Sequence, residues 1–97
     1  MAQIKNNTIE ALNKLRLSPT VRKKVDRIRD TVLYAPIISD FVDLAKANGP
    51  RPKDKPVEGK AGWYASHGGE YYWYAYVVDT EKNEIYITEL ILYEGMI

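Results

Sequence analysis

Residues 71–79 read YYWYAYVVD, and this stretch decides how the rest of the chain folds. Aromatic and β-branched residues favour strands. Successive side chains of a strand point to opposite faces of a sheet, so this strand carries large side chains on both faces. Residues 63–93 also hold seven of the eight tyrosines and both tryptophans. The aromatic content is therefore concentrated in one sheet.

Turn residues on both sides of this stretch predict an antiparallel meander. Gly68-Gly69 favours a tight hairpin turn, and residues 80–83 supply the turn after it. We expect strands over 63–67, 70–79 and 84–93, within a meander that spans residues 62–97.

Residues 1–48 read mainly as helix. Ser18-Pro19 predicts a helix start, because serine caps the free amides and proline fits the first helical position. Further helical patterns predict a short helix after Thr8 that includes Leu15 and a helix over 37–48 that ends at Asn48-Gly49. The helix that begins at Ser18-Pro19 has its apolar stripe at Val21, Val25, Ile28, Val32 and Leu33. Residues 3–5 are a candidate for a short edge strand.

Residues 49–61 differ in composition from both halves. They hold three of the five prolines and four lysines or arginines, with no apolar period. We expect a basic, proline-rich loop whose charges stay in water. The whole chain is thus expected to form one domain, 1–97, of the α+β class. Two or three N-terminal helices would pack on one face of a three- to four-stranded antiparallel sheet.

The two faces of the sheet are expected to differ in function. The small side chain of Ala75 leaves room for a helix to pack closely against its face of the sheet. We expect this core face to include Trp73 and Val77 of the same strand and Ile85, Ile87 and Ile91 of the last strand. The opposite, open face would then present a platform of phenolic rings. Tyrosine suits such a surface because it offers large contact area with few torsions to freeze. The platform residues are Tyr72, Tyr74, Tyr76 and Tyr86.

Charge is unevenly distributed along the chain. The overall net charge is +1, but residues 1–31 hold eight basic against three acidic residues, and residues 61–97 hold one against six. A basic helical half and an acidic, aromatic sheet half imply two different surfaces. We include Arg22, Lys23 and Arg27 among the candidate binding residues, for an acidic protein segment or for nucleic acid.

Several classes of function lack any support. The chain has no cysteine, no apolar run long enough to span a bilayer and no signal-peptide core, so we expect a cytoplasmic protein that binds no membrane. Neither metal-ligand spacing nor a glycine-rich phosphate loop is present, so no metal and no cofactor are expected. The weak catalytic candidates are His67, the one histidine, and Tyr93.

The order of elements resembles the RelE/ParE superfamily of bacterial toxins from type II toxin–antitoxin pairs. The residues that carry the resemblance are 18–24 (SPTVRKK) at a helix start, 71–79 (YYWYAYVVD) and 84–91 (EIYITELI). The resemblance implies a helical hairpin on a curved antiparallel sheet. Its ribonuclease members place basic residues on the sheet, whereas this chain has Tyr72 where arginine is common and Tyr93-Glu94 at the end of the last strand.

Three functions remain open at this stage. The chain is expected to bind a protein target through an aromatic, acidic sheet face, as a toxin-like protein without nuclease activity whose partner is an antitoxin or a host protein. The first alternative is a ribosome-dependent mRNA endoribonuclease that uses His67 and Tyr93. The second alternative is a phage or mobile-element inhibitor of a host defence protein.

Overall fold

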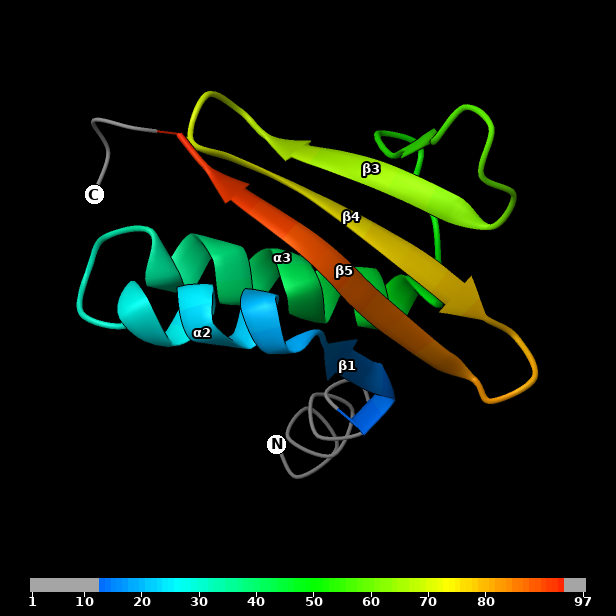
Figure 1. The fold of residues 1–97 in the computed structure, drawn as a ribbon, viewed down its shortest axis with the longest axis horizontal. Coiled ribbons are helices and arrows are strands. Elements are labelled where there is room, and N and C mark those ends of the chain that lie inside the picture. Colours follow the sequence, from blue (N-terminus) through cyan, green and yellow to red (C-terminus); the bar gives the residue numbers. More distant parts are fainter. Residues whose placement is uncertain (1–12, 94–97) are drawn as a thin grey trace.

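The computed structural model describes residues 13–93 and has an α+β fold with two helices and a five-stranded sheet (Figure 1). The expected strand over 3–5 and the helix start at Thr8 lie outside the described residues. In chain order the elements are β1 (Leu15–Leu17), α2 (Pro19–Arg27), α3 (Tyr34–Ala47), β2 (Lys55–Pro56), β3 (Trp63–Gly68), β4 (Tyr72–Asp79) and β5 (Glu84–Leu92).

The sheet is mixed, with strand order β1-β5-β4-β3-β2. β2 to β5 are antiparallel neighbours, as the turns predict, but β1 pairs in parallel with β5, Arg16 opposite Tyr86. The expectation of three or four purely antiparallel strands is therefore wrong, because two short strands lie in segments assigned to helix and loop. Leu15 belongs to β1 and not to a helix, since Leu15 and Leu17 alternate with exposed Arg16.

α2 begins and α3 ends as local chemistry predicts, but α3 begins at Tyr34 and not at 37, because Pro36 lies in its first turn, where a missing N–H is tolerated. The hydroxyl of Ser18 accepts a hydrogen bond from the amide of Val21 at 3.1 Å, and Pro19 is the first residue of α2, as predicted. α3 ends at Asn48, whose φ of 61° is left-handed. α2 is shorter than its apolar stripe suggested: it ends at Arg27, so Val32 lies outside it and is 80% exposed.

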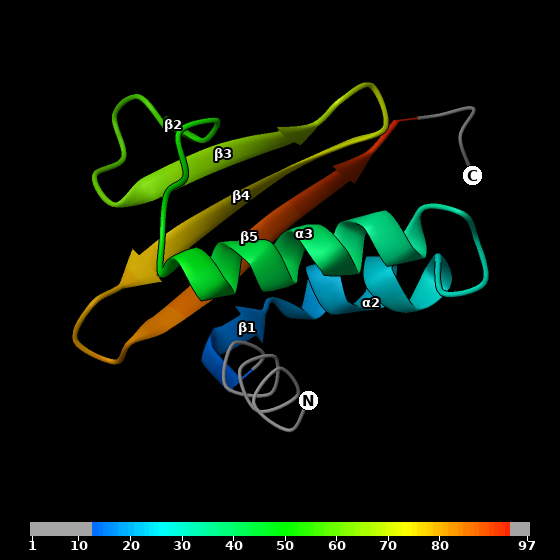
Figure 2. The ribbon, with the colours of Figure 1, turned by 180° about the vertical axis from the view of Figure 1, so that it is seen from behind.

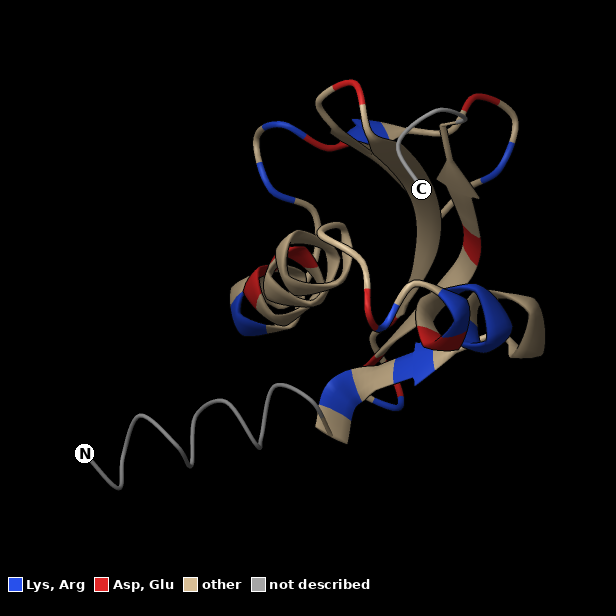
Figure 3. Cartoon of the chain, turned by 90° about the vertical axis from the view of Figure 1, so that its left-hand side faces the viewer, with Lys and Arg blue, Asp and Glu red and all other residues tan. Residues whose placement is uncertain are grey.

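α2 and α3 pack on the same side of the sheet, and the opposite side carries no helix of the described chain (Figures 2 and 3). α2 also lies along the part of β5 that extends beyond β1. There the Ser18 hydroxyl donates to the carbonyl of Thr88 at 3.2 Å, and Lys24 Nζ donates to the carbonyl of Leu90 at 2.6 Å. These donors occupy carbonyls that would otherwise lie free at a sheet edge.

A β-bulge in β5 sets which side chains enter the core. Ala75 pairs with Glu89 and the next residue, Tyr76, pairs with Ile87, which leaves Thr88 as the extra residue. The bulge reverses the alternation, so that Ile87 and Leu90 both point to the helices. Ile85 and Ile87 are buried as predicted, but Ile91 is exposed, contrary to prediction, and Leu90 takes its place in the core.

Candidate functional site

The three platform tyrosines of β4 are buried beneath the helices. Tyr72 is 6% exposed, and Tyr74 and Tyr76 are 0% exposed. The prediction that these three rings form an open platform is therefore wrong. Their neighbours Trp73 and Val77, which were expected in the core, are half-buried on the opposite face. Of the four platform residues only Tyr86 lies on the open face, at 41% exposure.

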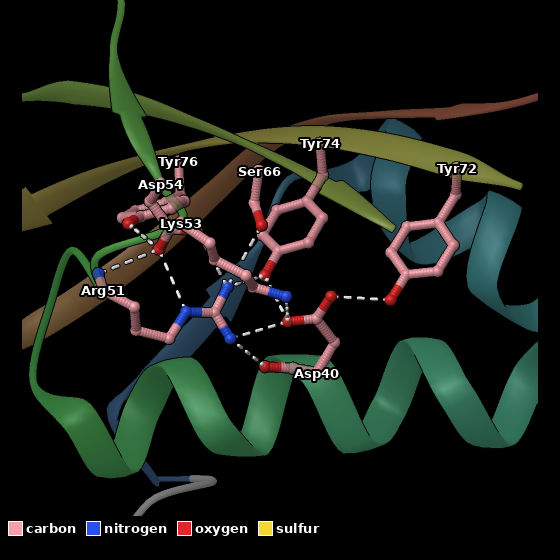
Figure 4. A network of polar contacts seen from close by, with 8 residues as sticks. All are labelled: Asp40, Arg51, Lys53, Asp54, Ser66, Tyr72, Tyr74 and Tyr76. Atoms are coloured by element: carbon pink, nitrogen blue, oxygen red, sulfur yellow. Dashed lines mark hydrogen bonds and ion pairs between the residues drawn. The ribbon is translucent and has the colours of Figure 1, made fainter. Parts of the chain in front are cut away.

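The hydroxyls of these tyrosines end in a buried polar cluster, the Arg51 cluster, between β4 and α3 (Figure 4). Tyr72 and Tyr74 donate to Asp40 of α3 at 2.6 and 2.9 Å, and Tyr76 donates to Asp54 at 2.6 Å. The cluster comprises Asp40, Arg51, Lys53, Asp54, Ser66, Tyr72, Tyr74 and Tyr76.

Arg51 holds the Arg51 cluster together from the segment after α3. Its Nη1 donates to Asp40 Oδ1 at 2.7 Å, and its Nε donates to Asp54 Oδ2 at 3.0 Å. Its Nη2 reaches the hydroxyls of Tyr74 at 2.8 Å and Ser66 at 3.2 Å. Residues 49–61 were expected to keep their charges in water, which is wrong for Arg51 and Asp54, because each finds a partner of opposite charge under the sheet.

The charges of the Arg51 cluster are fixed by these contacts. Burial raises the pKa of Asp40, but hydrogen bonds from Tyr72, Arg51 and Tyr74 outweigh that effect and leave the pKa below its usual value. Burial likewise raises the pKa of Asp54, and its bonds to Arg51 and Tyr76 lower it further than burial raises it. Both carboxylates therefore stay ionised around Arg51, with Lys53 Nζ 3.6 Å from Asp40.

The three tyrosines stay neutral because burial and the nearby carboxylates both disfavour a phenolate. Burial raises the pKa of Tyr72, Tyr74 and Tyr76, and the neighbouring carboxylates raise it further. Within residues 13–93, every buried side-chain nitrogen or oxygen has a hydrogen-bond partner. The buried side chains of the cluster are thus all engaged with one another, and only Lys53 at its edge is exposed. We therefore interpret the Arg51 cluster as structural and look for function on the other face.

One signal in the sequence could have located this cluster. Asp40 lies in the apolar stripe of α3 that Ile37, Phe41 and Leu44 define at helical spacing. A carboxylate in such a stripe must be paired when it is buried. Arg51 is the first basic residue after the helix and could therefore pair with Asp40. The tyrosine hydroxyls of the strand could donate hydrogen bonds to the same carboxylate.

The open face of the sheet carries a different group of side chains. Strand pairing places Arg16, Tyr86, Val77 and Trp63 in one row across β1, β5, β4 and β3. This row surrounds a shallow hollow of about 590 Å³, the anchor hollow. Its lining residues are Arg16, Leu17, Trp63, Val77, Asp79, Lys82, Glu84, Tyr86 and Thr88.

The walls of the anchor hollow are held by polar contacts at its ends. Arg16 pairs with Glu84 at 2.9 Å. Lys60 Nζ lies 4.4 Å from the ring centroid of Trp63, close enough for a cation–π contact. Both contacts restrict side chains before any partner arrives, so an incoming group meets a partly ordered surface.

The basic candidates lie on α2, beside this face. Arg22, Lys23 and Arg27 are exposed, and no carboxylate of residues 13–93 pairs with any of them. Arg29, just after the end of α2, forms an ion pair with Asp26 at 3.0 Å. The row of blue segments along β1 and α2 is visible in Figure 3.

The two catalytic candidates lie on β3 and just after β5. His67 is exposed on β3 and its ring meets the edge of Trp73, with 6.2 Å between centroids. Tyr93 follows β5, and its amide donates to the carbonyl of Tyr71. In the described part of the chain, no hydrogen bond joins His67 to Tyr93 or to a lysine or arginine side chain.

Known proteins add no further constraint. No protein-family model, curated protein sequence or solved structure matches the chain. Within residues 13–93, no helix has the length and apolar character to cross a bilayer. No group of three or more potential metal-ligating side chains forms among these same residues.

Proposed function

We propose that this chain is a small protein-binding protein that engages its target through the open face of the sheet. The main observation behind this proposal is that α2 and α3 pack on one side of the sheet (Figure 2), while Trp63, Val77 and Tyr86 surround a hollow on the other side. Aromatic residues at a concave surface are typical of binding hot spots. Of the residues expected on the binding face only Tyr86 remains there, and Trp63 and Val77 join it.

The resemblance to RelE/ParE toxins suggests what kind of target to seek. An antitoxin or a host protein is the expected partner of a toxin-like chain without a nuclease site. Expression of the chain alone in a bacterial host tests whether it is a toxin. If the chain arrests growth and the His67→Ala variant does so too, the result supports a toxin that acts by binding. Growth arrest that is lost in the His67→Ala variant, with the fold intact, argues for the ribonuclease instead.

Selection of a displayed-peptide library on the immobilised protein tests the binding face directly. The test variant is Tyr86→Arg, which places a charged group at the mouth of the anchor hollow. The matched control is Tyr71→Arg, because Tyr71 is 46% exposed, close to the 41% of Tyr86, but lies in a separate hollow with Val32 and Pro36.

We expect selected peptides to lose at least about tenfold in affinity for Tyr86→Arg, as for a hot-spot residue, and to bind Tyr71→Arg normally. Circular dichroism checks that both variants fold. Enriched peptides that bind Tyr86→Arg as well as the parent protein would contradict the proposal.

A further inference from the structure

We propose that the target segment is acidic and carries one bulky apolar anchor, with the anchor in the hollow and the acidic residues over the basic surface of α2. This inference rests on the proposed function and specifies the chemistry of the partner. Two independent features carry it: the neutral, aromatic anchor hollow and the excess of positive charge at its β1–α2 border.

The anchor hollow favours an apolar side chain over a charged one. Val77 forms its floor between the rings of Trp63 and Tyr86. The four charged residues in its lining are two cations and two carboxylates, and Arg16 and Glu84 already pair with each other. A charged head would lose water here without gaining an unpaired opposite charge. An aliphatic or aromatic side chain has no charge to desolvate and gains free energy by burying its apolar surface.

The border of the hollow is strongly basic. Residues 13–30 hold seven lysines and arginines against two aspartates. Two contacts locate this segment along β5: Arg16 lies opposite Tyr86, and Lys24 Nζ reaches the carbonyl of Leu90. Lys23 and Arg27 are one turn apart on α2 and exposed. A target segment that runs from the anchor hollow across β5 therefore meets Lys23 and Arg27, which form no ion pair with the carboxylates of residues 13–93.

The pattern of charges favours an acidic protein segment over nucleic acid. Asp26 of α2 and Asp30 just after it interrupt the basic segment, Glu84 lines the hollow, and Glu89 lies further along β5. A nucleic-acid backbone has a charge at every nucleotide and would bring phosphates against these carboxylates. A protein segment can place its acidic residues opposite Lys23 and Arg27 and uncharged residues elsewhere.

Three short synthetic peptides test this inference on the full chain. The first has one tryptophan followed by glutamates, the second has lysines in place of the glutamates, and the third has alanine in place of the tryptophan. A single-stranded oligonucleotide serves as the fourth probe. Amide chemical shifts report the location of binding, and titration gives the affinity for each probe.

We expect only the first peptide to bind well, with shifts at Trp63, Val77 and Tyr86 and at Lys23 and Arg27. Reversing one exposed charge should be visible but moderate, so Lys23→Glu is expected to weaken that peptide about fivefold. The matched control is Lys46→Glu, which makes the same charge change on α3 and should leave the affinity unaltered. Raised salt should weaken the first peptide as well.

Other outcomes would overturn the inference in distinguishable ways. Equal binding of the lysine peptide at the hollow would refute the acidic partner but leave the proposed function standing. Selected library peptides that need Tyr86 yet carry no acidic residues would do the same. Tighter binding of the oligonucleotide, with shifts confined to α2, would show that the basic surface serves nucleic acid. If no peptide shifts the open face and the library selection also fails, the proposed function itself is wrong.

Discussion

Tyr72 of β4 and Asp40 of α3 are joined by a 2.6 Å hydrogen bond that links the sheet to the helix above it. Asp40 is 7% exposed and Tyr72 is 6% exposed, so water cannot replace either partner without opening the core. This contact and its neighbours around Arg51 decide which face of the sheet is inside. They also offer the most direct tests of the structure.

Removing the Tyr72 hydroxyl should destabilise the fold. Tyr72→Phe keeps the ring but takes the donor from Asp40 Oδ2, which leaves a buried acceptor without that partner. We expect the free energy of unfolding to fall by about 1–3 kcal/mol. Urea denaturation measures it, with Tyr86→Phe as the control on the open face, where a change near zero is expected. Equal effects of the two substitutions would contradict the assignment of faces.

Loss of Arg51 should cost more than loss of any one tyrosine hydroxyl. Arg51→Ala leaves Asp40 and Asp54 buried without their cation, and breaking a buried ion pair typically costs about 3–5 kcal/mol. Arg22→Ala removes the same side chain from an exposed site and should change stability by less than about 0.5 kcal/mol. If Arg51→Ala unfolds at the same urea concentration as the parent protein, residue 51 does not lie beneath the sheet.

Stability should be lost on both sides of neutral pH, for two different reasons. Asp40 and Asp54 have lowered pKa values in the folded state, so the unfolded chain binds more protons at acid pH. Their contribution is therefore present above the unfolded pKa of about 4 and is lost as the pH falls below it. Thermal unfolding as a function of pH measures this effect.

Asp40→Asn should flatten the acid limb of that profile, although it lowers stability at neutral pH. The control is Asp43→Asn, an exposed residue of the same helix, which should keep the acid limb of the parent protein. An unchanged acid limb in Asp40→Asn would show that Asp40 does not couple to folding.

The alkaline limb has the opposite sign. Tyr72, Tyr74 and Tyr76 have raised pKa values in the folded state, so their contribution is complete below the unfolded pKa of about 10 and declines as the pH rises above it. We expect these three phenols to ionise only together with unfolding. Tyrosinate absorbance followed beside circular dichroism checks this, and early ionisation of all eight tyrosines would argue against their burial.

Gly68 should tolerate no side chain, because the ring of Tyr72 lies directly against it. A Cβ at this position would lie 2.1 Å from Cζ of Tyr72, so the ring and its bond to Asp40 would have to move. We expect Gly68→Ala to cost about 2 kcal/mol or more. In a Tyr72→Ala background the added cost of Gly68→Ala should be much smaller. Additive costs would show that the ring and the glycine do not touch.

The start of α2, the end of α3 and the turns of this protein could be predicted from local sequence, whereas the start of α3 at Tyr34 was missed by three residues. Ser18-Pro19 begins α2 and Asn48 ends α3, because capping and left-handed φ depend on a few neighbouring residues. The Gly68-Gly69 turn and the pairing of β3 with β4 follow equally from local chemistry. The α+β class with helices on one side of a sheet followed from the order of these elements.

Which face of the sheet packs against the helices could not be predicted from local sequence. Both faces of β4 have large side chains, so alternation alone does not say which one meets the helices. The choice depends on Asp40 and on Arg51, which lie 32 and 23 residues away from the tyrosines that they bind. In β5 the bulge at Thr88 reverses the alternation, and a bulge is set by pairing with another strand.

Local sequence was thus enough to predict α2, the three long strands β3 to β5 and the concentration of aromatic residues in one sheet, but not β1 or β2. Long-range packing was needed to place Tyr72, Tyr74 and Tyr76 inside and to leave Trp63, Val77 and Tyr86 on the open face. This is so because a phenol is stable in either environment. In water its hydroxyl is hydrated, and in the core it needs a carboxylate that a distant part of the chain must deliver.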